Sequence, residues 1–368
     1  MSPEDLLARL VGFPTVVGTP NGAVLEDIAT YLRGFGAQVD ILTGPEGDRS
    51  NLFASFGPRD VAGIVLSGHI DVVPAGEPEW QADPFVLRHE GQRLIGRGAC
   101  DMKGFLAAVL AAAPAMGEAD LAKPIHIAIS YDEEAGCKGV PHLLAALPSL
   151  CALPEAAIIG EPTGLVPVLA HKGKAALRLV ARGVSGHSSR PDLGVNAIQT
   201  LVPVLARICE TAHDLTTGPQ DARFAPPYSS VQIGTIAGGQ AVNIIPDLAE
   251  AQIEARAIAG VSPRAILEEI CADLPEGVSA EFLADYPALA LDAGDPLVAL
   301  AEEISGHQAQ GAVSFGTEAG LFQQAGIPAI VCGPGDIARA HKPEEYLTRS
   351  ELEAAHAMVL ALVVRCSA

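Results

Sequence analysis

The stretch Gly98-Ala99-Cys100-Asp101-Met102-Lys103-Gly104 places one carboxylate among small residues, between two glycines. A long apolar run, Phe105–Ala113, follows almost directly and predicts a buried helix. We therefore expect Asp101 in a loop just before a helix begins, where functional side chains often converge. A lone loop aspartate is more often a turn former or a helix cap, so its meaning depends on the rest of the chain.

The length and the net charge of the chain limit the number of domains and the kinds of partner that are expected. A chain of 368 residues is too long for one ordinary core, so about two domains are expected. Acidic residues number 44 against 23 basic ones, which gives a formal net charge of -21. That balance disfavours nucleic acid and anionic membrane surfaces as partners and favours cationic small molecules or metal ions. Much of the acidity is equally well explained as a means of keeping the protein soluble.

The cysteines and the apolar runs indicate a compartment. Seven cysteines are scattered without a CxxC spacing, which favours a reducing environment over a disulfide framework. The first residues show no basic region leading into an apolar core, so we expect no signal peptide. The longest apolar runs fall short of the roughly 20 residues that span a bilayer. The sequence therefore predicts a soluble, cytoplasmic protein without a membrane partner.

The two ends of the chain alternate helical and strand patterns. Strand character appears at 51–56, 63–67, 125–130, 156–159 and, after residue 285, at 327–332. Runs 63–67 and 156–159 are apolar throughout, as strands covered on both faces are. Helical patterns at 105–113, 139–147, 297–304, 317–325 and 350–364 lie between or after these strands. Residues 1–173 and 285–368 are thus expected to form one α/β catalytic domain.

The middle of the chain, residues 174–284, has a different pattern. Alternating apolar residues at 175–181 predict a half-buried strand, and apolar residues at helical spacing follow over 195–208, with Pro203 a predicted kink. Strands at 230–236 and 248–257, a helix from Ser262-Pro263 and a strand at 278–282 complete the order β-α-β-β-α-β. This order is that of a ferredoxin-like domain, inserted here into the larger one.

Metal-binding side chains follow several of the buried strands, in the stretches Gly68-His69-Ile70-Asp71, Tyr131-Asp132-Glu133-Glu134, Gly160-Glu161-Pro162 and Ala340-His341-Lys342-Pro343. In open α/β sheets, ligands bind outside the carboxyl ends of the strands. We therefore expect five residues to point into one crevice: His69, Asp101, Glu134, Glu161 and His341. Each residue alone is more often structural, and the repetition after buried strands carries the hypothesis.

Two histidines and three carboxylates suit a pair of zinc-class ions with one shared aspartate. One ion would take His69, Asp101 and Glu161, and the other would take Asp101, Glu134 and His341. A buried group of carboxylates would repel itself without a cation between its members. The sequence does not decide between zinc and cobalt, because both suit the same ligands. Asp71, two residues after His69, fits the carboxylate that orients a metal-binding imidazole.

These stretches resemble the co-catalytic zinc hydrolases, a family that includes acetylornithine deacetylases, succinyl-diaminopimelate desuccinylases, aminoacylases and glutamate carboxypeptidases. The motifs are Gly68-His69-Ile70-Asp71-Val72-Val73-Pro74, Gly96-Arg97-Gly98-Ala99-Cys100-Asp101-Met102-Lys103-Gly104, Asp132-Glu133-Glu134 and Gly160-Glu161-Pro162-Thr163. The resemblance covers nearly the whole chain. It implies a catalytic domain with a central mixed sheet flanked by helices, and a lid domain at 174–284 that also forms a homodimer.

Within that family, the acetylornithine deacetylases look most similar, on Gly160-Glu161-Pro162-Thr163, Ala170-His171-Lys172-Gly173, Gly186-His187-Ser188-Ser189-Arg190-Pro191, Gly316-Thr317-Glu318-Ala319-Gly320 and the ending around His341. The resemblance implies that Glu133 is the general acid/base and that His187 polarises the oxyanion, in relatives often across a dimer interface. It also implies a cis peptide bond after Asp101. Substrate-binding positions would be Asn243, Arg256, Gly316 and Thr317. His187 as a turn residue and Arg256 as a strand surface charge are the plainer alternatives.

The implied activity is hydrolysis of the amide bond of an N-acyl amino acid, with N2-acetyl-L-ornithine, an intermediate of arginine synthesis, as the expected substrate. Desuccinylase, aminoacylase and dipeptidase activities share the same metal chemistry, so the ligands do not separate them. A non-catalytic protein that binds a metal or an amino acid is the alternative from another class. The intact ligands together with Glu133 argue against that alternative.

Overall fold

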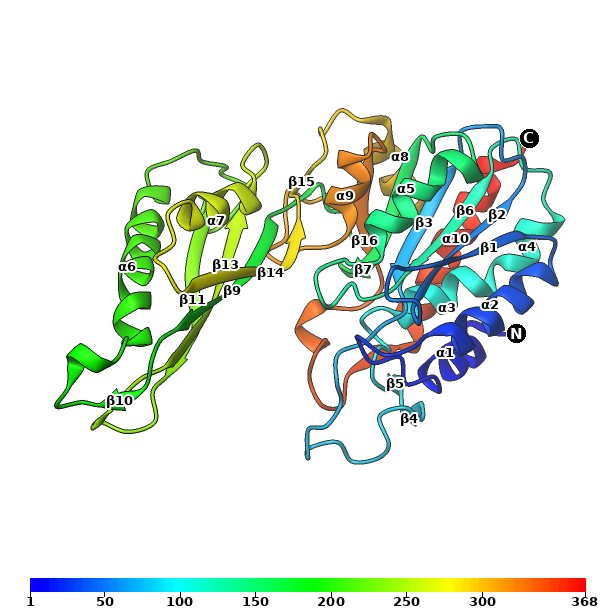
Figure 1. Cartoon of the computed structure of the whole chain (residues 1–368). Helices are drawn as coiled ribbons and strands as arrows, with labels where there is room; N and C mark the ends of the chain where they lie inside the picture. The colour runs from blue at the N-terminus through cyan, green and yellow to red at the C-terminus, as the bar shows by residue number, and fades with distance from the viewer. The chain divides into compact units, whose positions relative to one another are not determined.

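A six-stranded sheet lies at the centre of one of the two units into which the chain divides (Figure 1). The computed structural model describes all of residues 1–368. Unit 1 comprises Met1–Ala170, Leu289–Gly311 and Thr317–Ala368, and unit 2 comprises His171–Ala288 and Ala312–Gly316. Residues 312–316 were expected to belong to the catalytic domain, but in the structure they cluster with unit 2.

The sheet of unit 1 is mixed, with the strand order β1-β2-β6-β3-β7-β16. Its strands are β1 (Gln38–Thr43), β2 (Ser50–Phe56), β6 (Ile125–Ser130), β3 (Ile64–His69), β7 (Ala156–Pro162) and β16 (Ala329–Gly333). The last four are parallel to one another, whereas β1 and β2 are antiparallel to their neighbours. The carboxyl ends of β6, β3, β7 and β16 therefore meet at one edge, where a site was expected.

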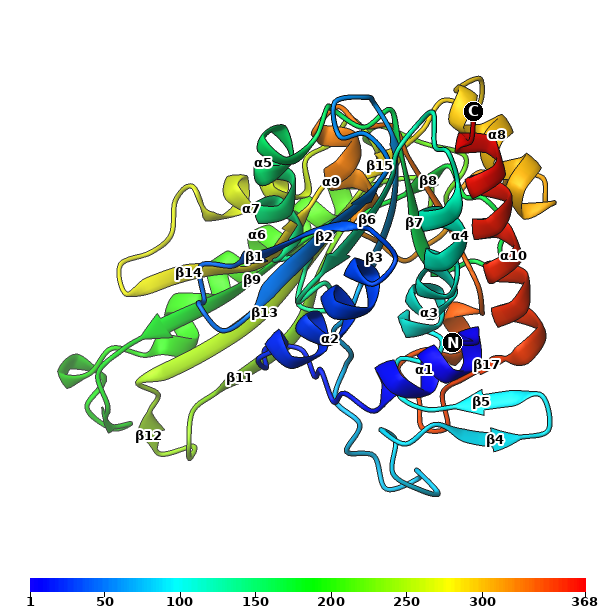
Figure 2. The ribbon, with the colours of Figure 1, turned by 90° about the vertical axis from the view of Figure 1, so that its right-hand side faces the viewer.

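Helices cover both faces of this sheet, as the views in Figures 1 and 2 show. They are α1 (Pro3–Val11), α2 (Gly22–Arg33), α3 (Lys103–Ala111), α4 (Ala113–Glu118), α5 (Val140–Leu150), α8 (Pro296–Ser305), α9 (Ala319–Gln324) and α10 (Arg349–Cys366). Helices α5 and α9 pack on one face, and α3 packs on the other, against α1 and α10. Strands buried on both faces explain the uninterrupted apolar runs of the sequence. The expected α/β fold is confirmed.

A small antiparallel sheet completes unit 1, with the order β17-β5-β4. Its strands are β4 (Arg88–Glu90), β5 (Arg93–Ile95) and β17 (Tyr346–Thr348). The sequence did not predict these three strands, because each has only three residues and shows no periodicity. The pairing of β17 with β5 brings the C-terminal segment beside the loop that carries Asp101.

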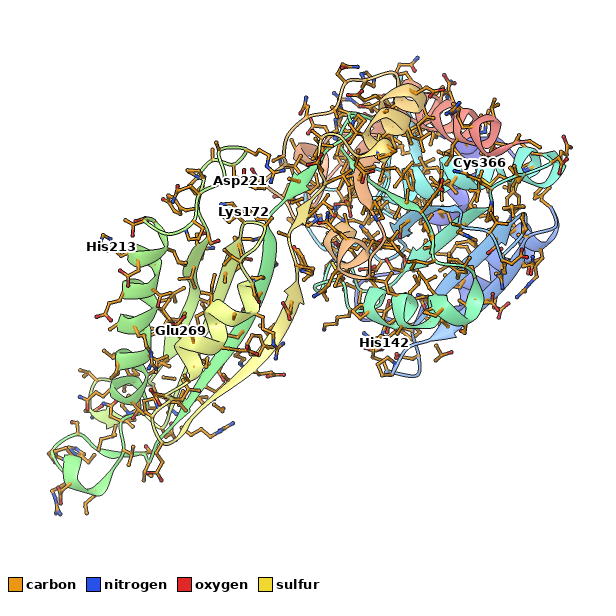
Figure 3. The ribbon with its side chains drawn as sticks, turned by 90° about the horizontal axis from the view of Figure 1, so that it is seen from above. His142, Lys172, His213, Asp221, Glu269 and Cys366 are labelled. Carbon is orange, nitrogen blue, oxygen red and sulfur yellow. The ribbon has the colours of Figure 1, made fainter.

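Unit 2 has the element order and the sheet order of a ferredoxin-like domain. Its main elements are β9 (Gly173–Arg182), α6 (Ala197–Leu215), β11 (Ser230–Gly238), β13 (Leu248–Ala257), α7 (Pro263–Cys271) and β14 (Val278–Tyr286), and its short ones are β10 (Gly186–His187) and β12 (Ile244–Ile245). The sheet order is β11-β13-β9-β14, antiparallel throughout. Figure 3 shows His213 on α6 and Glu269 on α7, the helices that pack on this sheet. Helix α6 continues through Pro203.

Two short strands lie at or near the points where the chain passes between the units, β8 (Ala170–His171) and β15 (Leu289–Ala290). None of the helices combines the length and the hydropathy that are needed to cross a bilayer.

Candidate metal centre

Helix α3 can approach the strand ends closely because glycines precede two of the expected ligands. Gly68 comes before His69, and a Cβ atom at position 68 would lie 2.5 Å from Cε of Met102. Gly160 comes before Glu161, and a Cβ atom there would lie 2.0 Å from the ring of Phe105. Side chains at these positions would push the start of α3 away from the sheet. The two glycines thus let Asp101 lie beside the ends of β3 and β7.

Asp101 lies between the two expected histidines. Its Oδ1 atom is 3.1 Å from Nε2 of His69, and its Oδ2 atom is 3.3 Å from Nε2 of His341. One oxygen of the carboxylate therefore faces each imidazole, which is the arrangement that a bridging carboxylate needs. The peptide bond after Asp101 is cis, as the resemblance implied.

The two remaining carboxylates lie one beside each histidine. Glu161 Oε1 is 3.8 Å from Nε2 of His69, and Glu134 Oε1 is 2.9 Å from Nε2 of His341. All five residues expected as ligands are thus brought together within unit 1. Ligand atoms of His69, Asp101 and Glu134 also lie within 4.8 Å of one another, and so do those of His69, Glu133 and Glu161.

His341 reaches this cluster from an irregular loop after β16 and the 3-10 turn Ile337–Arg339. Its backbone φ is +59°, in the left-handed region that non-glycine residues rarely adopt. Asp132, beside Glu133, has a φ of +50° and Cys137 one of +57°. Such conformations concentrate at functional sites, where the surrounding structure holds them in place.

The electrostatics of the cluster favour positive charge at its centre. Hydrogen bonds to Asp101 and Glu134 raise the pKa of His341 to about 10. Burial alone would lower the pKa of His69, but its hydrogen bond to Asp101 and the charges of Asp71 and Glu161 raise it well above its usual value. Burial, followed by the charge of Asp101, raises the pKa of Glu161 well above its ordinary value. Protons on Glu161 and on the two imidazoles thus offset the negative charge of the carboxylates, as a bound cation would.

This donor set fits divalent metal ions of the zinc class. Imidazole nitrogens and carboxylate oxygens are ligands that zinc takes in proteins, and the cluster offers two of the former and three of the latter. Four of the five side chains are at most 9% exposed, whereas that of His341 is 49% exposed. The residues present therefore fit the group that the sequence implied.

Asp71 makes further contacts besides the expected one with His69. Nδ1 of His69 pairs with the backbone carbonyl oxygen of Asp71 at 2.9 Å, whereas the Asp71 carboxylate is 3.6 Å away. The carboxylate also accepts hydrogen bonds from the backbone N–H groups of Glu133, at 3.1 Å, and Glu134, at 3.2 Å. Asp71 thus connects the loop after β3 to the loop after β6.

The carboxyl group of Glu133 lies beside the cluster, on a half-buried residue. Burial, with the charges of Glu134 and Asp71, raises its pKa to about 8. The thiol of Cys137 donates a hydrogen bond to its Oε1 atom at 3.2 Å. A group with a pKa near neutrality is suited to accept and return a proton.

Sequence reasoning missed Glu318 and Cys137 as neighbours of the cluster. Glu318 is fully buried, and its carboxylate accepts hydrogen bonds from the hydroxyl groups of Ser67 and Ser130, on β3 and β6. It lay within the quoted stretch Gly316-Thr317-Glu318-Ala319-Gly320 but had no pattern of its own. Thr317 is also fully buried, and its Oγ1 atom accepts a hydrogen bond from the N–H of Ala319.

The expected substrate residues of unit 2 fall into two groups. His187 is paired with Ile244 in the ribbon of β10 and β12, and the carbonyl of Asn243 accepts a hydrogen bond from Ser188 N–H in the same ribbon. Arg256 lies near the other end of β13, where its guanidinium donates to Glu254. The 10 residues of β13 span about 30 Å.

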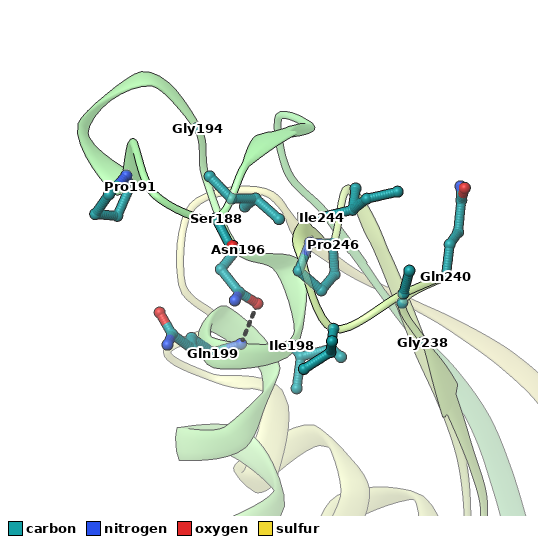
Figure 4. Close-up of a pocket in the computed structure, with 14 residues that line it drawn as sticks. Ser188, Pro191, Gly194, Asn196, Ile198, Gln199, Gly238, Gln240, Ile244 and Pro246 are labelled. Carbon is teal, nitrogen blue, oxygen red and sulfur yellow. Dashed lines mark hydrogen bonds between the residues drawn. The ribbon is translucent and has the colours of Figure 1, made fainter.

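Gly316 belongs to the Arg256 end of unit 2, because a Cβ atom there would lie 2.5 Å from the ring of Tyr286. A cavity of about 620 Å³ lies beside the β10–β12 ribbon, and Ser188, Asn196, Ile244 and Pro246 are among the residues that line it (Figure 4). The Asn196 side chain accepts a hydrogen bond from the N–H of Gln199 at the start of α6. The lining contains no charged side chain.

Residues 65–365 match the model of peptidase family M20/M25/M40, so the chain belongs to this family. The protein is a metallohydrolase that acts on amide bonds. Its relatives include acetylornithine deacetylases. The one from Proteus mirabilis (strain HI4320) is 33% identical over 95% of this chain and 92% of its own length. The one from Vibrio vulnificus (strain CMCP6) is 35% identical over 89% and 87%.

Solved structures agree on the fold. The chain is similar to an M20 family metallo-carboxypeptidase from Sulfolobus solfataricus, with a TM-score of 0.78, 18% identity and 99% coverage of both chains. It is also similar to a tripeptidase from Staphylococcus aureus, with a TM-score of 0.74, 18% identity, and coverage of 98% of this chain and 96% of that one. The α/β fold with its central mixed sheet is thus the fold of the family, and unit 2 is consistent with it.

Proposed function

We propose that the protein hydrolyses N2-acetyl-L-ornithine to L-ornithine and acetate, a step of arginine synthesis. The observation that carries the proposal is full-length similarity to acetylornithine deacetylases, at 33% identity over 95% of the chain. The clustering of the five expected ligands supports the hydrolytic part of the proposal. The net charge of -21 suits a substrate whose side chain is cationic.

The proposed cofactor is a pair of zinc ions, for which cobalt is a chemical substitute. His69 and Glu161 would hold one ion, Glu134 and His341 the other, and Asp101 both. The facing of each Asp101 oxygen toward one imidazole supports this division. Bound ions of this class would lower the pKa of water toward ~7 and polarise the scissile carbonyl.

Glu133 is the proposed general acid/base. Its carboxyl group would accept a proton from the attacking water and then donate that proton to the leaving amine. Asp71 would hold Glu133 in place through the backbone hydrogen bond, and Cys137 would hold its Oε1 atom. Burial of Asp71 and the pKa of about 8 for Glu133 support proton transfer near neutral pH.

The proposed substrate contacts come from both ends of unit 2, which would act as a lid, and from Thr317 of unit 1. Arg256, with Gly316 and Thr317, would bind the carboxylate of the substrate, while His187 and Asn243 would stabilise the oxyanion. The length of β13 prevents both groups from reaching the same small substrate from one copy of unit 2. We therefore propose a homodimer in which His187 and Asn243 complete the site of the partner subunit.

A panel assay tests the proposed substrate. Free amine released from N-acetylornithine, N-acetylmethionine, N-succinyl-diaminopimelate and a dipeptide would be measured with the zinc-loaded protein. N-acetylornithine is expected to give the highest kcat/KM, and a chelator is expected to abolish turnover until Zn²⁺ is restored. Preference for another member of the panel would replace the proposed substrate with a desuccinylase, aminoacylase or dipeptidase activity. Binding without turnover on every member would support the non-catalytic alternative.

The proposed location is the cytoplasm. All seven cysteines are free thiols, and four of them (Cys100, Cys137, Cys332 and Cys366) are buried. Free thiols in this number are typical of a reducing compartment.

A further inference from the structure

We propose that the buried ion pair of Arg97 and Glu345 is a positioning clamp that fixes the Asp101 and His341 loops relative to each other. Neither residue belongs to the proposed ligand set, and neither contacts the proposed reacting atoms. The clamp's function rests on the proposed metal centre, but its effect on metal binding is measurable without any substrate.

Glu345 holds the backbone on which Asp101 is mounted. Its side chain is 1% exposed. The Oε1 atom accepts hydrogen bonds from the backbone N–H groups of Cys100, at 2.9 Å, and Asp101, at 3.1 Å. A carboxylate that accepts two backbone N–H groups fixes the position of that peptide segment. Because Glu345 follows His341 by four residues, the same side chain connects the loops of two proposed ligands.

Arg97 connects these loops to a third one. Its Nη1 atom donates to Oε2 of Glu345 at 2.9 Å and to the carbonyl oxygen of Lys342 at 3.2 Å. Its Nη2 atom donates to the carbonyl oxygen of Pro74 at 3.1 Å, on the segment that follows His69 and Asp71. One guanidinium therefore contacts the segments that follow β3 and β16, and it belongs to the segment that carries Asp101.

Arg97 bonds to these loops at the same time because its guanidinium group is planar and forked, and a lysine side chain would not reproduce these bonds. Arginine presents its N–H donors in a rigid planar fork, whereas a lysine ammonium is a single point charge on a flexible chain. Arg97 is 1% exposed, and it is further fixed by Glu77, at 3.0 Å, and by the ring of Trp80, whose centroid is 5.2 Å away. The fork is thus held in one orientation.

A purely stabilising role is the competing explanation. Buried ion pairs often contribute little net stability compared with apolar residues of similar volume. The donors and acceptors of this pair, however, are directed at loops that carry proposed ligands. Partners that orient metal-binding side chains typically affect metal affinity by ~10–100-fold when they are changed.

Arg97→Lys and Glu345→Gln test the clamp, with Arg59→Lys as the matched control. Like Arg97, Arg59 donates to several acceptors, here Ser55, the carbonyl of Gln38 and Asp40, and it lies near an aromatic ring, that of Phe53. It follows β2, whose carboxyl end lies opposite the proposed centre, because β2 is antiparallel to β6. The control thus alters a similar network away from the ligands.

The measurements are Zn²⁺ affinity by titration of the apoprotein with the metal alone, the visible absorption spectrum with Co²⁺ alone, and the thermal unfolding midpoint. We expect both clamp variants to bind Zn²⁺ ~10–100-fold more weakly and to shift the Co²⁺ spectrum, with the control unchanged in both. Arg97→Lys is expected to retain more affinity than Arg97→Ala, because it keeps the charge. A lower unfolding midpoint with wild-type affinity and spectrum would overturn the proposal in favour of a purely stabilising pair.

Steady-state kinetics provide an independent test of the clamp. With N-acetylornithine as the substrate, both clamp variants should lower kcat more than they raise KM, because they displace the centre and leave unit 2 unchanged. If the wild-type protein hydrolysed no member of the substrate panel, the proposed function would be wrong. The Zn²⁺ affinity and the Co²⁺ spectrum would still test the clamp.

Discussion

The Asp71 carboxylate accepts a hydrogen bond from the backbone N–H of Glu133 at 3.1 Å, and its Oδ1 atom lies 3.6 Å from Nδ1 of His69. Asp71 therefore holds the backbone of the proposed base by a hydrogen bond and acts on the neighbouring His69 mainly through its charge. Asp71→Asn should leave the carbonyl contact to His69 intact but lose one of the two backbone hydrogen bonds, because an amide has a single acceptor oxygen. We expect retained metal and a kcat lowered ~10–100-fold.

Metal content by mass spectrometry and steady-state kinetics check this prediction. Asp83→Asn is a suitable control, because Asp83 also accepts a backbone N–H, that of Phe85, but in an exposed loop. Loss of metal from Asp71→Asn at unchanged kcat per bound metal would mean that Asp71 supports His69 after all.

Glu133→Ala should separate metal binding from turnover. The carboxyl group lies beside the five proposed ligands, so its removal should spare metal content while lowering kcat by at least ~10²–10⁴. Glu118→Ala, at an exposed position of α4, provides the control. Near wild-type turnover in Glu133→Ala would refute its role as the base.

Two buried histidines should make the stability depend on pH. Burial lowers the pKa of His126 and that of His171 to about 4, below the value of 6.5 for an exposed histidine. Between pH 6.5 and 4 the unfolded chain therefore binds more protons than the folded one, so stability is present above pH 6.5 and declines as the pH falls. The loss should be ~1–2 kcal/mol per histidine at pH 5.

Urea unfolding of the metal-free protein at pH 7 and pH 5 measures this effect. Changing both histidines to glutamine should reduce the difference in the free energy of unfolding between the two pH values. An unchanged difference would assign the acid sensitivity to the carboxylate cluster instead.

Inactive variants should complement each other if sites are shared between subunits. His187→Ala and Arg256→Ala, each expected to be nearly inactive alone, would be coexpressed. Because the two residues lie at opposite ends of β13, a heterodimer would contain one site with both defects and one intact site. Random pairing should then restore about one quarter of wild-type activity. Activity equal to the sum of the separate variants would exclude a shared site.

The strands that carry the ligands were predictable from sequence because they are buried on both faces. The run Ala156–Ile159 is apolar without interruption, and the bounds of β6, Ile125–Ser130, agree with the prediction. The five expected ligands converge because parallel strands place their carboxyl ends at one edge. Edge strand β1 was not predicted, because its residues are half-buried or exposed and follow no clear alternation.

Contacts through the backbone were not predictable. The sequence places Asp71 near His69, but only the structure shows that its carboxylate turns toward Glu133 and Glu134. Glu318 and Glu345 are buried acids whose partners lie far away in sequence, and no periodicity identifies such pairs. Local patterns report burial, whereas these contacts depend on how distant loops fold over the strand ends.

The order of the strands has a consequence for synthesis of the protein. Strand β16 pairs with β7, and His341 follows β16 near the C-terminus, so the catalytic unit is built from both ends of the chain. A ribosome makes the N-terminal segments first, and domains fold as units as they emerge. The sheet of unit 1 therefore stays incomplete until β16 has been synthesised, and the inserted unit 2 has the opportunity to fold in the meantime.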